Sequence, residues 1–309
     1  MGGGGGSSYR DWDSEQLSRA VREDSEKASA DFDTILSAYT AELLGIFNGR
    51  DAQLVRERLD EATEALKEEL QAELDCLFGG SVAKHTYVDG LSDIDSLMIL
   101  DSAKFADQTP AAILRQMAST LRAKLADPVT VETGTMAVRL SYPDRMEIQL
   151  LPALRSESGL HVPSFLHDGW STIEPEGFQR ALVKRNSECG AKLVPTIKLA
   201  KAVVANFPEK YRLSGYHIES LAIAAFRNYE GVKTTSRMLP HFFEQSRDLV
   251  LAPIRDSTGQ SIHVDGYLGE ENSAHRRELS HVLAGIAKRM RNASSAQSKE
   301  RWAELFESE

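Results

Sequence analysis

Apolar residues recur at helical spacing through the first quarter of the chain. A first helix is predicted from a capping residue at position 13 or 14 to Asn48-Gly49, with a break near Ala30. A second helix is predicted over residues 51–77, because its apolar side chains, mostly leucine, lie three, four or five positions apart. The chain therefore begins with two long amphipathic helices.

The middle of the chain replaces this pattern with short apolar runs. Strands are predicted over residues 93–100, 129–140 and 146–151, and a helix over residues 111–126. From about Phe178 the pattern is helical again. The helices predicted there cover residues 178–206 with a break near Pro195, 215–228, 239–250, 272–292 and 296–306.

This order of elements indicates an α+β protein with two lobes and a cleft between them, where small-molecule sites commonly lie. The 309 residues, of which 41% are hydrophobic, are enough for two cores. We expect residues 1–12 to form a flexible glycine-rich leader, residues 13–175 to hold the N-terminal helices and a catalytic domain, and residues 176–309 to form a helical C-terminal lobe.

Composition and charge narrow the class of protein. No apolar run approaches the ~18–20 residues that cross a membrane. Two distant cysteines, Cys76 and Cys189, indicate a reducing cytoplasm rather than a disulfide scaffold. The 18 acidic and 8 basic residues before residue 81 account for the whole net charge of -10, so long nucleic acid is not an expected partner. Residues 180–212 are locally basic, which suits a small polyanion such as a nucleotide.

Two carboxylates open the first predicted strand. Asp93 and Asp95 lie two positions apart, so on a strand they point the same way. Such a pair is costly unless a cation lies between the carboxylates, and oxygen ligands suit Mg²⁺ or Mn²⁺. Two such ions can activate a hydroxyl and neutralise a leaving pyrophosphate. Upstream, Gly80 permits close approach of the backbone to a phosphate, and the Ser81 hydroxyl can hold it.

A glycine-serine pair, a spacer and Asp-x-Asp resemble the signature of the DNA polymerase β-type nucleotidyltransferases. The third metal-binding carboxylate of that superfamily lies on a later strand, often shortly before Pro-Ala. Here Pro152-Ala153 ends such a segment, strict alignment places Gln149 at the acidic position, and Glu147 shares its strand face. We take Glu147 as the third ligand implied by the resemblance, with Gln149 as the alternative.

Later motifs resemble one branch, the bacterial cyclic GMP–AMP synthase-like and oligoadenylate synthase-like enzymes. Lys201 matches a lysine that meets the triphosphate, and Lys198 precedes it by one helical turn. The segment beginning at Ser214 resembles one in which a serine contacts phosphate and a tyrosine stacks on a base. Gly215 aligns with that serine, so Ser214 stands in for it, and Tyr216 is the stacking candidate; packing of Tyr216 in a core is the alternative.

The resemblance covers about residues 65–306 and includes the segments 253–259, 265–269 and 302–306. It implies a polymerase β-type fold, two Mg²⁺ or Mn²⁺ ions, and nucleoside triphosphates, ATP among them, as substrates. The implied product is a cyclic or short linear oligonucleotide second messenger of anti-phage signalling (CBASS), made in the cytoplasm with release of pyrophosphate. The acidic N-terminal helices are either a docking site for a regulatory protein or structural packing.

Two other functions stay open on the sequence. The same fold can transfer a nucleotide to an RNA end, a small molecule or a protein side chain. A chain without its third acidic residue can instead be a catalytically inactive, nucleotide-binding regulatory protein, and Gln149 keeps this alternative open. The sequence does not identify the bases, the linkage or the size of the product.

Overall fold

The computed structural model describes residues 13–49, 52–70, 75–78, 94–105, 107–144, 146–156, 159–164, 169–173, 175–254 and 265–307. The predictions for the leader at residues 1–12 and for Gly80, Ser81 and Asp93 lie outside these residues. For Asp95 the backbone alone is described.

Seven strands form one mixed sheet in the order β1-β2-β5-β4-β3, with β6 pairing to β5 and β7 pairing to β6. The β2–β5 pair is parallel and the other pairs are antiparallel. The strands are β1 Asp75–Phe78, β2 Ile94–Leu100, β3 Thr130–Thr133, β4 Val138–Ser141, β5 Glu147–Ser156, β6 Gly159–Pro163 and β7 Trp170–Ile173.

Strand alternation gives this sheet two apolar faces. One face packs against α2 (Ala52–Leu70) and α5 (Pro110–Lys124), which lie on the same side of the sheet; α4 (Ser102–Phe105) is a short helix after β2. From β2 and β5 this face receives Met98, Leu100, Ile148, Leu150 and Leu154. The opposite face carries a smaller cluster of Leu97, Ile99, Ala153, Leu160 and Val162. Residues 95, 147 and 149 therefore begin the row on this less covered face.

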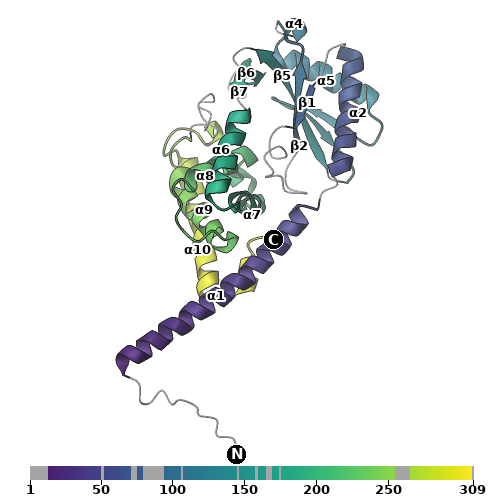
Figure 1. The fold of residues 1–309 in the computed structure, drawn as a ribbon. Coiled ribbons are helices and arrows are strands. Elements are labelled where there is room, and N and C mark those ends of the chain that lie inside the picture. The colour runs from purple at the N-terminus through teal and green to yellow at the C-terminus, as the bar shows by residue number, and fades with distance from the viewer. Residues whose placement is uncertain are drawn as a thin grey trace, which may run out of the picture.

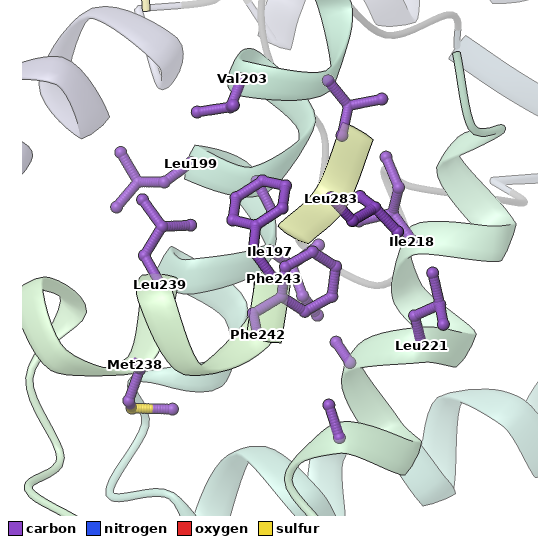
Figure 2. Packing of buried hydrophobic residues seen from close by; sticks show 14 of the residues in the cluster. Ile197, Leu199, Val203, Ile218, Leu221, Met238, Leu239, Phe242, Phe243 and Leu283 are labelled. Carbon is purple, nitrogen blue, oxygen red and sulfur yellow. The ribbon is translucent and has the colours of Figure 1, made fainter. Parts of the chain in front are cut away.

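The second half of the chain is a helical lobe with its own core (Figures 1 and 2). Phe242 and Phe243 lie at the centre of this core, edge to face, with ring centroids 5.1 Å apart. The helices of the lobe are α6 Pro175–Glu188, α7 Leu193–Ala205, α8 Gly215–Ala225, α9 Thr235–Leu249, α10 Ala274–Ser295 and α11 Lys299–Ala303, with 3₁₀ turns η2 Glu209–Tyr211 and η3 Gly266–Leu268.

Helix α1 (Ser14–Phe47) is a single helix that packs on this helical lobe. Its N-cap Asp13 forms a capping box with Gln16, as the predicted start requires. Phe32 and Leu36 join the core of the lobe, and Asp33 pairs with Arg237 at 2.6 Å. The N-terminal half of α1 extends away from the other described elements (Figure 1).

Several predicted boundaries near the sheet were wrong. The leucine spacing predicted a helix to residue 77, but α2 ends at Leu70 and residues 75–78 form β1 beside β2. The predicted strand 129–140 is the hairpin of β3 and β4, closed where the Gly134 N–H bonds to the Ala137 carbonyl at 2.8 Å. Periodicity cannot separate a short apolar strand from a buried helical turn, which explains the first error.

The predicted breaks in the helices were also misplaced. Helix α1 is continuous through Ala30. Pro195 lies in the first turn of α7, where a missing N–H removes no helical hydrogen bond. The chain instead breaks after α6 at Gly190 and Ala191, which both have positive φ, 60° and 61°. The strands β6 and β7 were not predicted.

Candidate active site

The parallel pairing of β2 and β5 brings the candidate metal ligands onto neighbouring strands. The register pairs Ile94 with Ile148 and Asp95 with Gln149. Because Ile148 and Leu150 are fully buried on the other face, positions 95, 147 and 149 share the row on the less covered face.

The Glu147 carboxylate is partly open to solvent, with 41% of its side chain exposed. Its Oε2 lies 4.0 Å from Nε of Arg139, which comes from the neighbouring strand β4. An ion pair of this length and exposure contributes little to stability. Exchange of the Arg139 contact for a metal cation would therefore cost little, and the oxygen donors in this row suit a hard divalent ion.

The second group of candidate residues gathers where α7 meets the start of α8. Lys201 is only 6% exposed, and its Nζ donates to Oε1 of Glu219, itself 1% exposed, at 2.9 Å. A Cβ built on Gly215 would lie 3.4 Å from this Nζ, so the ammonium rests against the first residue of α8. The structure thus brings Lys201 to the same place as Ser214 and Tyr216, with Glu219 as a partner that the sequence did not assign.

Ser214 and Tyr216 occupy the first turn of α8. Ser214 is the N-cap, and its Oγ accepts a bond from the N–H of His217 at 3.2 Å. A hydroxyl in that role can still donate its hydrogen to a phosphate oxygen. The ring of Tyr216 packs on Phe178 of α6, with centroids 4.5 Å apart. This contact supports the core-packing interpretation for one side of the Tyr216 ring.

Lys198 lies one turn before Lys201 and is tied to the end of α1. Its Nζ donates to Oδ1 of Asn48, the C-cap residue of α1. Burial, and then the charge of Lys201, lower the pKa of Lys198 from its usual value. Two neighbouring ammonium groups with restricted hydration form a site that an anion would stabilise.

Sequence reasoning missed a buried polar network behind the first turn of α8. Arg276, 0% exposed, donates through Nη1 to Oδ2 of Asp265 at 2.7 Å and through Nε to the carbonyl of Gly269 at 2.9 Å. Nδ1 of His217 bonds to the Tyr267 hydroxyl at 2.7 Å, and its Nε2 lies 3.8 Å from Oδ2 of Asp265. The segment 265–269 had signalled a motif, but nothing in the sequence pairs it with His217.

This network should make stability depend on pH. Burial lowers the pKa of His217 to about 4. The negative charge of Asp265 raises this pKa, and the positive charge of Arg276 lowers it further. The unfolded state, in which histidine titrates near 6.5, therefore takes up the proton first as the pH falls. We expect the free energy of unfolding to decrease by about 3 kcal/mol from this group between about pH 7 and pH 4.

Urea unfolding across this pH range, compared with the His217→Asn variant, measures the effect. The variant should be less stable at pH 7 and should lose this part of the pH dependence. Parallel pH profiles for the two proteins would contradict the assignment.

Comparison with known protein families bears on the same elements. Residues 47–186 match the Second Messenger Oligonucleotide or Dinucleotide Synthetase domain, a span from the end of α1 to α6 that includes the β2–β5 pair. No curated protein matches the chain.

Solved structures match over nearly the whole chain. One is the Bradyrhizobium diazoefficiens CD-NTase CdnG in complex with GTP, with 15% identity and a TM-score of 0.67, covering 87% of this chain and 94% of that chain. Together with the domain match, this likeness confirms the resemblance to the cGAS/DncV-like nucleotidyltransferases. The chain has their polymerase β-type fold, and residues 47–186 match the domain of an oligonucleotide-synthesising nucleotidyltransferase.

Two further CD-NTases show the same fold. E. coli MS115-1 CdnC with ATP matches at 15% identity and a TM-score of 0.65, covering 91% of this chain and 96% of that chain. A complex of this CdnC with HORMA-deltaN matches at 14% identity and a TM-score of 0.60, covering 81% of this chain and 89% of that chain. Vibrio cholerae DncV cyclic AMP-GMP synthase, in complex with the linear intermediate pppA(3',5')pG, matches at 9% identity and a TM-score of 0.60, covering 96% of this chain and 89% of that chain.

Among the described residues, no helix is long and apolar enough to span a membrane. The same residues, to which Asp93 does not belong, contain no group of three His, Cys, Asp or Glu side chains that could hold a metal ion.

Proposed function

We propose that the protein joins nucleoside triphosphates, ATP among them, into a cyclic or short linear oligonucleotide second messenger and releases pyrophosphate. The β2–β5 register carries this proposal, because it sets Asp95 beside Gln149, two residues from Glu147, inside the matched synthetase domain. The nucleotides in the matched CdnG, CdnC and DncV structures support it.

Asp93, Asp95 and Glu147 are the residues we assign to metal binding. Carboxylate oxygens suit Mg²⁺ or Mn²⁺, and the Glu147 carboxylate already lies 4.0 Å from a cation, Nε of Arg139. Two such ions would supply charge neutralisation at the attacking oxygen and at the leaving pyrophosphate. Glu147 would also orient the acceptor hydroxyl and take up its proton.

The phosphates of the donor nucleotide lie, in this proposal, between the two lobes. We assign Gly80 and Ser81 to binding these phosphates, together with Lys198, Lys201 and Ser214 of the helical lobe. The 2′- or 3′-hydroxyl oxygen of the acceptor attacks the α-phosphorus, the bond to the bridging oxygen breaks, and pyrophosphate leaves toward the lysines. Catalysis by these residues is mainly positioning and charge stabilisation. Tyr216 would stack on a base with the side of its ring away from Phe178.

The wider setting is part of the same proposal. We place the boundary between the catalytic domain and the helical lobe at residues 175 and 176, with the leader at 1–12 outside both. The product would act in cytoplasmic anti-phage signalling (CBASS). The exposed N-terminal half of α1 is our candidate surface for a regulatory protein, supported by the HORMA-deltaN complex of the matched CdnC.

The test is product formation. We expect the purified protein, incubated with four labelled nucleoside triphosphates and Mg²⁺ or Mn²⁺, to yield a nucleotide that resists phosphatase. The double variant Asp93→Ala/Asp95→Ala should yield none, whereas Asp107→Ala, which removes an exposed carboxylate from the loop after α4, should match the wild type. Equal product from wild type and double variant would refute the site. No product from the wild type with either metal would favour another acceptor or the inactive regulatory alternative.

A further inference from the structure

The first turn of α8 is held from behind by the segment around η3. The hydroxyl of Tyr267 accepts a bond from the backbone N–H of Ser214 at 3.3 Å. The same hydroxyl pairs with Nδ1 of His217 at 2.7 Å. Tyr267 therefore contacts both Ser214, the N-cap residue of α8, and His217. These two residues are themselves linked, because the Ser214 hydroxyl accepts a hydrogen bond from the N–H of His217.

The Tyr267 oxygen accepts from the Ser214 N–H, and its own hydrogen can be donated to Nδ1 of His217 in the tautomer that carries its hydrogen on Nε2. Nε2 of His217 lies 3.8 Å from Oδ2 of Asp265, which is beyond hydrogen-bond distance. Burial lowers the pKa of His217, so the neutral imidazole that this arrangement needs is the stable form.

Asp265 in turn is held by hydrogen bonds from one buried side chain and one backbone N–H. Its carboxylate accepts from Arg276 at 2.7 Å and from the N–H of Ile254 at 3.2 Å, and both Asp265 and Arg276 are fully buried. The chain of contacts thus runs from a rigid buried ion pair through His217 and Tyr267 to the exposed Ser214.

We propose that Tyr267 is a positioning residue for the triphosphate, which holds the first turn of α8, with the Ser214 hydroxyl at its start, against the Lys201 ammonium. This inference rests on the proposed nucleotide site. The closeness of Lys201 to Gly215 supports it, because a shift of the first turn of α8 would separate the two phosphate-binding groups. Tyr267 itself is 40% exposed, so its ring is not needed to fill the core.

The experiment compares Tyr267→Phe with wild type in binding to a non-hydrolysable triphosphate analogue and to the monophosphate of the same nucleoside. We expect the affinity for the triphosphate to fall about tenfold and that for the monophosphate to change less than twofold, since one polar contact is lost at the phosphates alone. Tyr229→Phe removes a comparable hydroxyl bond, to the Val232 carbonyl at 3.0 Å, and should leave both affinities unchanged.

A double-mutant cycle with Ser214→Ala tests whether Tyr267 acts through Ser214. The two losses of triphosphate affinity should be clearly less than additive. Additive losses, equal losses for both ligands, or no loss in Tyr267→Phe would overturn the inference. Thermal unfolding of each variant sets the temperature of the binding measurement below its own melting point, so that a global loss of structure is not mistaken for the effect. A wild type that binds triphosphate and monophosphate equally would instead refute the proposed function itself.

Discussion

Replacement of Arg276 by methionine should lower the free energy of unfolding by about 3–5 kcal/mol, because it leaves the Asp265 carboxylate buried without its charged partner. Arg276 also donates to the carbonyls of Val250 and Gly269 at 2.9 Å each, of Asp265 at 3.2 Å and of Ala252 at 3.4 Å, so five acceptors lose a donor. Urea unfolding at pH 7 measures the loss as a shift of the midpoint.

The neighbouring arginine provides the control. Arg277 is exposed and bonds to the carbonyl of Asn272 at 2.7 Å, so Arg277→Met should cost less than about 1 kcal/mol. Adding Asp265→Asn to Arg276→Met removes the stranded charge and should restore part of the stability. A loss below about 1 kcal/mol for Arg276→Met alone would show that the pair does not hold this part of the lobe together.

On our proposed assignment of Glu147 as a metal ligand, Glu147→Gln should reduce product formation by about 10²–10³-fold, because loss of the carboxylate removes several kcal/mol of charge stabilisation in the transition state. The substitution preserves the size of the side chain, and the partly exposed site requires little repacking. The measurement is the rate of product formation at saturating triphosphate, at several Mg²⁺ concentrations.

Gln149 is the matched comparison on the same strand face. Gln149→Ala should reduce the rate less than about tenfold if Glu147 is the third ligand, in line with loss of an outer contact. The reverse order, with the larger loss at Gln149, would move the ligand assignment to the residue directly paired with Asp95. The register alone does not choose between them, because both positions lie on one face of β5.

Local rules predicted much of the helical structure. The capping residue Asp13, the stop at Asn48 and the helix start at residue 215 lie where side-chain chemistry and spacing place them. The rules failed for β1, because the sequence positions of Leu74 and Leu77 continue the helical spacing of α2, whereas residues 75–78 form a strand paired with β2. Pairing partners far along the chain are not encoded in any local pattern.

The candidate site, too, was only partly predictable from the sequence. The sequence singled out Lys201 and the segment from Ser214, and the structure brings them together beside Gly215. It did not indicate that Lys201 is paired with buried Glu219, nor that Tyr267 lies behind Ser214. These contacts join residues 18 and 53 positions apart, so they follow from the packing of α7, α8 and the segment at η3 rather than from spacing.

The two halves of α1 differ in what sustains their helical state. Starting a helix is unfavourable because several backbone dihedrals are fixed for the first hydrogen bond, whereas each later residue adds one bond. The half anchored by Phe32 and Leu36 provides the nucleus for the whole helix. The outer half only has to propagate from it, with the Asp13 capping box at the far end. We therefore expect the number of helical residues in the outer half to vary with temperature and with any ligand that binds there, while the anchored half stays helical.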